Sequence, residues 1–479
     1  QMITRSVAQC SPSLLLRLST SGTARTGRFL VPLARAGTRR EASSSAAPLA
    51  ASALVKGEQE ASVAAEAVVK QLRAKLGDRD AVCTIWFAKG YGPRAKVVGP
   101  LLQEKLGDGV VIGSNAEGGI IGDGCEVQKE TFALAALALR LPGLSVFPFY
   151  APDLSVLPEL GRGGRWDALA EAAAPPVILA FCTLPSPPGA DPQGWMSVLD
   201  NALTGRIGQR AGRIDSKTRR LSAVLGGLTV SDQVYVDGEV YKGGGFGVVL
   251  QAQGLGRGTH LDAVVCQGAK PFGPWLKITG IEGDHIITGL DDKNPREVLE
   301  PLLHSPEVPG TGHSMAGIFV DPKPADGVSE ALSAAALAEA AMSGRPSCLV
   351  RPMHQFTPEG HLVISPLLES VPYEGGMQLQ LNCYSQETAI EDLEARAEHD
   401  VALHEGPPDA SLLVMCGARG EQLYSNEGVE SDVLRKVWGQ NVPTVGFFAG
   451  GEIGPVGLKT YLHGYTTCCL MVRGSNAPS

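Results

Sequence analysis

Apolar positions recur with helical spacing in several stretches of the chain. Between residues 59 and 76 they return every three or four positions, so the sequence predicts an amphipathic helix there. Similar spacing predicts helices over 295–303, over the alanine-rich stretch 329–342 and over 387–399. Ser385, just before the last of these, is a residue type that favours the start of a helix.

Continuous apolar runs predict buried strands, and one order of elements occurs three times. Each copy has an apolar strand, an amphipathic helix, a second strand that breaks at glycine, and a further strand. The copies begin at residues 81, 177 and 411, and their second strands read VVIGSNAEGG, AVLGGLTVSD and TVGFFAGGEIG. Self-similarity of this length predicts structurally related units. Chance similarity among glycine-rich strand ends is the alternative.

Between the second and third copies, apolar and polar residues alternate around glycine-containing turns. THLDAVVCQG, PWLKITGIEGDHII and SCLVRPMHQFTPEGHLVISP have the pattern of antiparallel hairpins. Helix-covered strands together with hairpins predict an α/β fold with mixed sheets, arranged as two related lobes. The glycine-rich stretch 254–259 marks a boundary. We therefore expect a leader and linker over 1–55, an N-terminal domain over 56–256 and a C-terminal domain over 257–474.

Composition and charge narrow the classes of partner. The chain has 479 residues, 44% hydrophobic and 19% charged, which suffices for two or three domains. No apolar run approaches the ~20 residues of a transmembrane helix, so we expect no membrane span. The net charge of −9 argues against nucleic acid as a partner. One basic strip fits a solvated helix face better than a nucleic-acid site: Arg206, Arg210, Arg213, Lys217, Arg219 and Arg220.

The first forty residues differ from the rest of the chain. They contain seven arginines, many serines and alanines, and no acidic residue before Glu41. This composition is typical of an organelle transit peptide, which predicts a plastid or mitochondrial protein. A disordered tail would have a similar composition and is the alternative.

Several chemistries lack their sequence signature. The ten cysteines form no CxxC pair and no zinc-like cluster with histidine, so we expect reduced thiols that pack as small apolar groups. No phosphate-binding loop, dinucleotide fingerprint or HExxH motif occurs, and we expect no cofactor and no metal. The nearest approach to a nucleophile elbow is GHSMA at 312–316, which ends in alanine and follows no strong strand.

The third copy carries the densest set of polar candidates. Its first strand ends at Cys416, followed by a turn with Gly417, Arg419 and Gly420. Ligands bind where strands of α/β sheets end, and the main-chain N–H groups of glycine turns can surround a small guest. Cys416 is therefore either a ligand contact or a buried strand-end residue. Arg419 is either a clamp for an anion or the partner of an acid such as Glu452.

A second glycine turn follows the next strand of this copy. It contributes Gly451, Glu452 and Gly454, and His463 lies before the last strand. Glu117 holds a comparable place in the first copy, so one carboxylate from each turn could face a shared polar site. Turn or capping roles for the acids, and a hydrogen-bonded structural role for the histidine, are the alternatives.

These stretches resemble the FIST sensory family. MCGARG (415–420), VPTVGFFAGGEIGPVG (442–457) and LHGYT (462–466) are similar to its C-terminal half. VVIGSNAEGG (110–119), SAVLGGL (222–228) and AVVCQGAKPFG with KITG (263–280) are similar to its N-terminal half and the junction. The resemblance covers roughly residues 60–472. It implies a bipartite α/β module that binds small molecules such as amino acids and has no established catalytic activity.

Some eukaryotic members of that family are fused to an F-box and act in ubiquitin ligases. Residues 1–58 show no pattern for an F-box helix bundle. We therefore expect a non-enzymatic binding protein. In it, Arg419 and the amides near Gly417, Gly420, Gly451 and Gly454 hold an anion, and Glu452 and Glu117 receive an amine or hydroxyl. The alternatives are a protein-recognition adaptor with a protein partner and, less favoured, an enzyme with Cys416 as nucleophile and His463 as base.

Overall fold

The computed structural model describes residues 48–171, 175–186, 191–204, 223–252, 259–306, 308, 312–320, 346, 348–367, 376–457 and 459–474. These residues belong to one compact unit, Ala46–Ser479. Four sequence-based predictions lie outside the described residues: residues 1–47 of the transit segment, the basic strip 206–220, the boundary stretch 254–258 and the helix 329–342.

The threefold recurrence expected from the sequence is confirmed as three repeats of one β-α-β-α-β-hairpin-β order. The first contains β1 (Ala50–Lys56), α1 (Ala61–Leu76), β2 (Cys83–Lys89), the 3-10 helix η1 (Gly92–Val97), α2 (Val98–Leu106), β3 (Val110–Asn115), β4 (Ile120–Gly122), β5 (Cys125–Val127) and β6 (Ala133–Leu139). The second contains β7 (Leu144–Ala151), α3 (Trp166–Glu171), β8 (Val177–Leu184), α4 (Pro192–Thr204), β9 (Ala223–Val230), β10 (Val234–Val236), β11 (Glu239–Tyr241) and β12 (Gly245–Ala252).

The third repeat is interrupted by an insertion. It begins with β13 (His260–Cys266) and resumes with α8 (Gln386–Leu403), β20 (Ala410–Cys416), α9 (Glu421–Tyr424), α10 (Val429–Trp438), β21 (Thr444–Ala449), β22 (Glu452–Val456), β23 (Lys459–His463) and β24 (Thr467–Arg473). The insertion is a closed barrel of β14 (Ala269–Glu282), β15 (Ile286–Leu290), β16 (His313–Val320), β17 (Leu349–Phe356), β18 (Leu362–Ile364) and β19 (Met377–Tyr384), with α6 (Pro295–Leu303) beside it.

Local sequence signals explain several of these elements. Helix α6 has the predicted bounds, with Asn294 as its N-cap and a proline in its first turn. Helix α8 begins after Ser385, which forms a capping box with Thr388. The GHSMA run lies in the regular strand β16 and makes no strand-to-helix elbow. The predicted α/β fold with mixed sheets is confirmed, and the described strands form three mixed sheets and a closed barrel.

Each repeat builds one sheet but sends its hairpin to another repeat. In the first sheet, β10 of the second repeat pairs with β3. In the second, β22 of the third repeat pairs with β9. In the third, β4 of the first repeat pairs with β21. The three sheets are thus interlocked in a cycle, because each one is completed by a hairpin from a different part of the chain.

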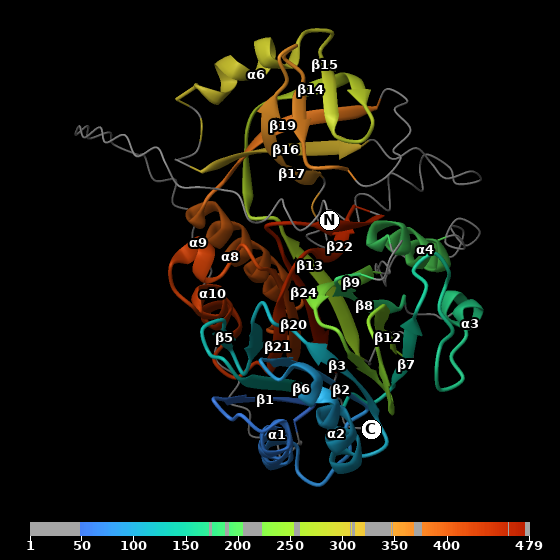
Figure 1. Cartoon of the computed structure of the whole chain (residues 1–479). Helices are drawn as coiled ribbons and strands as arrows, with labels where there is room; N and C mark the ends of the chain where they lie inside the picture. The colour runs from blue at the N-terminus through green and yellow to red at the C-terminus, as the bar shows by residue number, and fades with distance from the viewer. Residues whose placement is uncertain are drawn as a thin grey trace, which may run out of the picture. The chain divides into compact units, whose positions relative to one another are not determined.

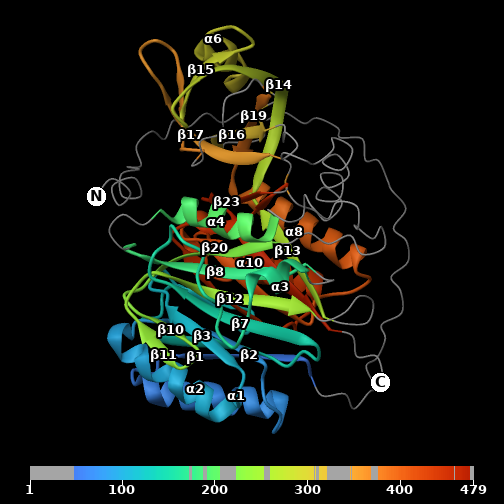
Figure 2. The same ribbon diagram turned by 90° about the vertical axis from the view of Figure 1, so that its right-hand side faces the viewer.

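The core follows from this arrangement. The inner faces of all three sheets share one apolar cluster, in which Phe87, Phe181 and Phe447 bring one ring from each repeat together. The outer faces are covered by helices: α1 and α2 pack on the first sheet, and α8 and α10 pack on the third. Figure 1 shows α1 and α2 side by side, and Figure 2 shows α3 and α4 along the strands of the second sheet.

Candidate functional site

The two glycine turns of the third repeat converge, as the sequence predicts. Strands β20 and β21 run parallel, with Cys416 opposite Ala449 at their ends. The Gly417 amide donates to the Ala449 carbonyl at 2.8 Å, so the two turns are joined directly. The Gly450 amide donates to the Leu228 carbonyl at 2.8 Å, which ties the second turn to β9 of the second repeat.

Cys416 and Glu452 lie in contact at this point. The thiol lies next to the Glu452 carboxylate, and the Cys416 amide donates to the Thr466 carbonyl at 2.9 Å. Burial, followed by the nearby Glu452 charge, raises the pKa of the Cys416 thiol well above its usual value. The side chain is therefore held as a neutral thiol, which is a poor nucleophile.

Glu452 is fully buried at the start of β22. Its Oε2 accepts a hydrogen bond from the Thr466 amide at 3.2 Å, whereas its Oε1 has no hydrogen-bond partner. Burial raises the pKa of this carboxyl well above its ordinary range. Because buried polar atoms almost always have a partner, the open Oε1 calls for an explanation.

His463 is the cross-strand neighbour of Glu452 in the β22–β23 hairpin. Its Nε2 lies 3.0 Å from the Gly454 carbonyl and donates to it, while the buried Nδ1 has no partner. Burial, and then the positive charge of Arg351, lower the pKa of His463 to about 3. The ring is therefore neutral at ordinary pH, with the lone pair of Nδ1 left open.

Arg419 is paired, but with an acid that the sequence analysis missed. Its Nε donates to Glu430 of α10, and both side chains are fully buried. Its Nη1 donates to the Tyr465 carbonyl at 2.9 Å, and its Nη2 lies 3.4 Å from the Tyr424 hydroxyl. The structural alternative for Arg419 named an acid such as Glu452, and the structure places Glu430 there. Every nitrogen of Arg419 contacts a protein group, so its role as an anion clamp stays a prediction without a free donor to support it.

The glycines of the site serve close packing. Gly420 adopts a φ of +58°, and a Cβ there would lie 2.3 Å from Gln128 Oε1. A Cβ on Gly454 would lie 2.8 Å from the Cys468 sulfur. A Cβ on the buried Gly451 would lie 3.1 Å from Leu462 Cδ1. These contacts explain glycine at the three positions, while contact of their amides with a ligand stays a prediction.

Glu117 joins the same region from the first repeat. It is exposed in the turn after β3, and its Oε2 accepts from the Gly90 amide at 3.0 Å. Two residues later, the Gly119 carbonyl accepts from the Phe448 amide at 3.0 Å, which fastens this turn to β21. The turn of Glu117 therefore meets the strand ends of the third repeat, but its carboxylate is held by Gly90.

Tyr384 is a site residue that the sequence analysis did not find. It ends the barrel strand β19, is 1% exposed, and its hydroxyl has no hydrogen-bond partner. Its ring contacts that of Tyr465 at 5.4 Å, and it lies within electrostatic range of Cys416 and Glu452. Tyr384 reaches the site only through the folding of the barrel, so the local sequence around it does not predict its position there.

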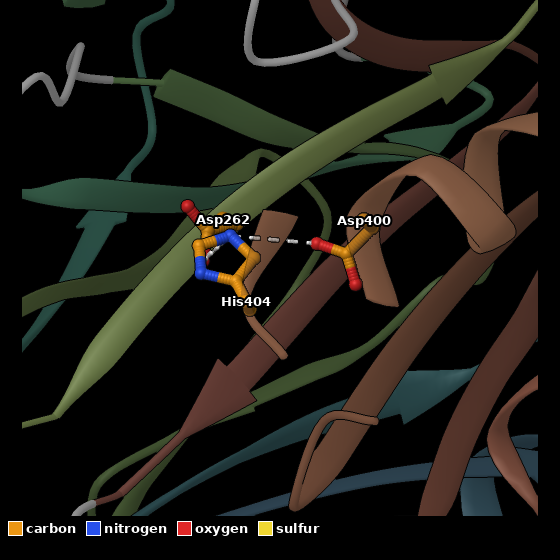
Figure 3. Close-up of side chains that lie close together, drawn as sticks. All are labelled: Asp262, Asp400 and His404. Carbon is orange, nitrogen blue, oxygen red and sulfur yellow. Dashed lines mark ion pairs between the residues drawn. The ribbon is translucent and has the colours of Figure 1, made fainter. Parts of the chain in front are cut away.

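A second group of titratable residues lies on the outer side of the third sheet. Figure 3 shows Asp262, Asp400 and His404 with their ligating atoms facing one another. His404 Nε2 is 3.3 Å from Asp262 Oδ2 and 3.7 Å from Asp400 Oδ1. Arg473 also enters the group, with Nη1 3.2 Å from Asp400 Oδ1 and 3.6 Å from Asp262 Oδ2. Since this guanidinium supplies the positive charge that a metal would bring, the group is an ion-pair network.

Comparison with known proteins relates the chain to one protein family. The FIST N domain model matches residues 82–293 and the FIST C domain model matches residues 327–455. An uncharacterized protein of Mycobacterium tuberculosis is 28% identical over 249 residues, which is 51% of this chain and 57% of the relative. An uncharacterized protein of Mycobacterium bovis is 27% identical over 256 residues, 51% of this chain and 59% of the relative. The chain thus spans less than two thirds of the length of these relatives.

Within the described ranges, none of the helices combines the length and apolar character needed to cross a membrane.

Proposed function

The chain belongs to the FIST family, and we propose that it is a non-enzymatic sensory protein that binds a small molecule at the strand ends around Glu452. The observation that carries this proposal is the unpaired Oε1 of a fully buried carboxyl. An amino acid or another small polar metabolite could supply the missing hydrogen bond.

The surroundings of Glu452 support a polar guest. The Tyr384 hydroxyl is a second buried polar atom without a partner, and it comes from the barrel rather than from the sheet. An unmatched buried polar group costs about 1–3 kcal/mol, so two of them in one neighbourhood favour occupation by a hydrogen-bonding molecule. Convergent polar groups at the carboxyl ends of strands are typical of ligand sites in α/β proteins.

The same geometry disfavours the cysteine-dependent enzyme. A catalytic thiol needs a lowered pKa and a base within hydrogen-bond reach. The pKa of Cys416 is raised, and its side-chain neighbour is the acid Glu452. His463 uses Nε2 to hold the Gly454 carbonyl and is neutral, so it has no hydrogen bond that would activate the thiol.

A thermal-shift screen against amino acids and organic acids tests the binding function. A ligand that binds only the folded chain adds about 2.7 kcal/mol of stability at 100 times its Kd, so the Tm must rise with concentration. Glu452→Gln keeps the shape of the side chain and should weaken the shift. Glu239→Gln, which changes an exposed acid on β11, is the matched control. A stoichiometric protein partner with no small-molecule effect would favour the adaptor role instead.

We also propose that the chain is imported into a plastid or mitochondrion. The arginine-rich, acid-poor composition of its first forty residues supports this location. Fusing residues 1–55 to a fluorescent protein should direct it to one organelle. The same fusion with the seven arginines replaced by glutamine should stay in the cytosol. Identical distribution of the two fusions would contradict the proposal.

A further inference from the structure

Arg351 is a buried cation at the junction of the barrel with the third repeat. It lies in β17 opposite Ala316 and is 3% exposed. Its Nη2 donates to the Leu462 carbonyl at 2.9 Å, which places the guanidinium against the end of β23 and next to His463. The sequence offered no signal for this position, because one arginine in an alternating hairpin usually points to solvent.

Arg351 forms no ion pair within contact distance in the described part of the chain, and the acid Asp284 acts on it from a longer range. Its hydrogen bonds go to three carbonyl oxygens: Pro366 at 3.0 Å, Val350 at 3.4 Å and Leu462 at 2.9 Å. The other two described arginines that are buried differ, since Arg419 pairs with Glu430 and Arg473 with Asp400. A buried charge without a contacting counter-charge is costly, and burial lowers the pKa of Arg351 to about 10.

The hydrogen-bond count of Arg351 is also incomplete. A guanidinium has five N–H groups, and three carbonyls can accept from only part of them. The contact with Val350 is its longest and joins adjacent residues, so Nη1 is the least satisfied nitrogen. Beside it, His463 presents the lone pair of Nδ1 without a partner, since Nε2 carries the hydrogen that bonds Gly454. The two side chains lie within electrostatic range of each other, so one buried region holds positively charged N–H donors and one open acceptor.

We propose that Arg351 and His463 bind an oxyanion that carries a hydroxyl hydrogen, such as hydrogen phosphate or bicarbonate. One oxygen accepts from the Arg351 guanidinium, and the hydroxyl donates to His463 Nδ1. A fully ionised oxyanion such as sulfate would set an oxygen lone pair against the nitrogen lone pair. The inference rests on the proposed binding function and names the anionic end of its ligand. In this inference the anion binds to Arg351 and not to Arg419, because every nitrogen of Arg419 already contacts a protein group.

The turn that follows His463 along the chain reaches solvent. His463 is followed by Gly464, which is exposed, and by Tyr465, which is half-buried and holds a φ of +62°. A Cβ added at Gly464 would meet no atom within 4 Å, so the outer side of the turn is open. A non-glycine residue with positive φ marks a strained turn, of the kind found where ligands enter.

Calorimetric titration of the whole chain with inorganic phosphate, bicarbonate and sulfate tests the proposal, at near-neutral pH and matched ionic strength. We expect phosphate or bicarbonate to bind about tenfold or more tightly than sulfate, because sulfate leaves Nδ1 unmatched. Arg351→Gln should abolish binding of the preferred anion. Arg296→Gln removes a positive charge from the same barrel, where Arg296 bonds the Thr357 carbonyl, and should leave binding unchanged.

Equal affinity for sulfate, absence of binding by phosphate and bicarbonate alike, or full binding by a folded Arg351→Gln variant would overturn the proposal. If that variant does not fold, the anion preference of the unmodified chain decides. If binding of a metabolite is weakened by Glu452→Gln but not by Arg351→Gln, the proposed function stands and this inference fails. If an anion binds through Arg351 but Glu452→Gln changes the binding of no metabolite, the site proposed around Glu452 is refuted and this inference stands.

Discussion

Arg419 and Glu430 form a fully buried ion pair between the turn after β20 and the first turn of α10. The carboxylate of Glu430 also accepts hydrogen bonds from the Tyr424 hydroxyl at 2.9 Å and the Thr467 hydroxyl at 2.7 Å. The pair therefore joins a turn, two helices and the last strand of the third repeat. These contacts hold together the elements around Glu452, on which the charges of Arg419 and Glu430 both act.

Glu430→Gln should destabilise the chain by about 3–5 kcal/mol, because it leaves the guanidinium of Arg419 buried without a counter-charge. Urea unfolding followed by circular dichroism measures the loss. The double variant Arg419→Met with Glu430→Leu removes both charges and should recover part of the stability. A single variant within about 0.5 kcal/mol of the unmodified chain would show that the pair carries little stability.

The exchanged hairpins predict that the two halves of the chain do not fold separately. A fragment of residues 48–256, which keeps β1, would lack β22 as the neighbour of β9 and β21 as the neighbour of β4. We expect this fragment to unfold without a cooperative transition, because two sheet edges and the shared core cluster are left open. Adding residues 257–474 as a separate chain should restore the transition. A cooperatively folded fragment alone would contradict the interlocked cycle.

Cys416 should resist alkylation in the folded state. Its pKa is raised by burial and by Glu452, so the thiolate fraction at neutral pH is very small. Iodoacetamide labelling followed by peptide mass spectrometry should show slow modification at neutral pH and faster modification in urea. Cys125, which is half-buried as Cys416 is, serves as an internal comparison of similar exposure. Rapid labelling of Cys416 near neutral pH would revive the enzyme hypothesis.

His463 should make the fold sensitive to acid. Its folded pKa is about 3 against an ordinary value near 6.5, so between these limits the unfolded chain binds a proton that the folded chain does not. The free energy of unfolding should fall as pH decreases through this window, by up to about 1.4 kcal/mol per pH unit. His463→Gln should flatten that part of the profile. His354→Gln, at an exposed position, should keep it; parallel profiles for all three proteins would refute the assignment.

Much of the site could be located from the sequence but not completed. Cys416 and Glu452 follow apolar strands at glycine turns, and parallel strands bring such turns together, so their contact could be foreseen. The partner of Arg419 could not, because an acid in the first turn of a helix is ordinary and does not announce burial. Tyr384 and Arg351 lie in barrel strands of alternating pattern. A single sequence does not show which positions of these strands face inward.

The sequence by itself determined the elements of this protein: the helices, the strands, their order and the threefold recurrence. These follow from periodicity and turn residues, which act over a few neighbouring positions. The tertiary structure alone decided which sheet receives each hairpin, which acid neutralises each arginine and which polar atoms are left without a partner. Those outcomes depend on contacts between residues tens to hundreds of positions apart, and the burial that gives them their energy exists only after the sheets have closed around one core.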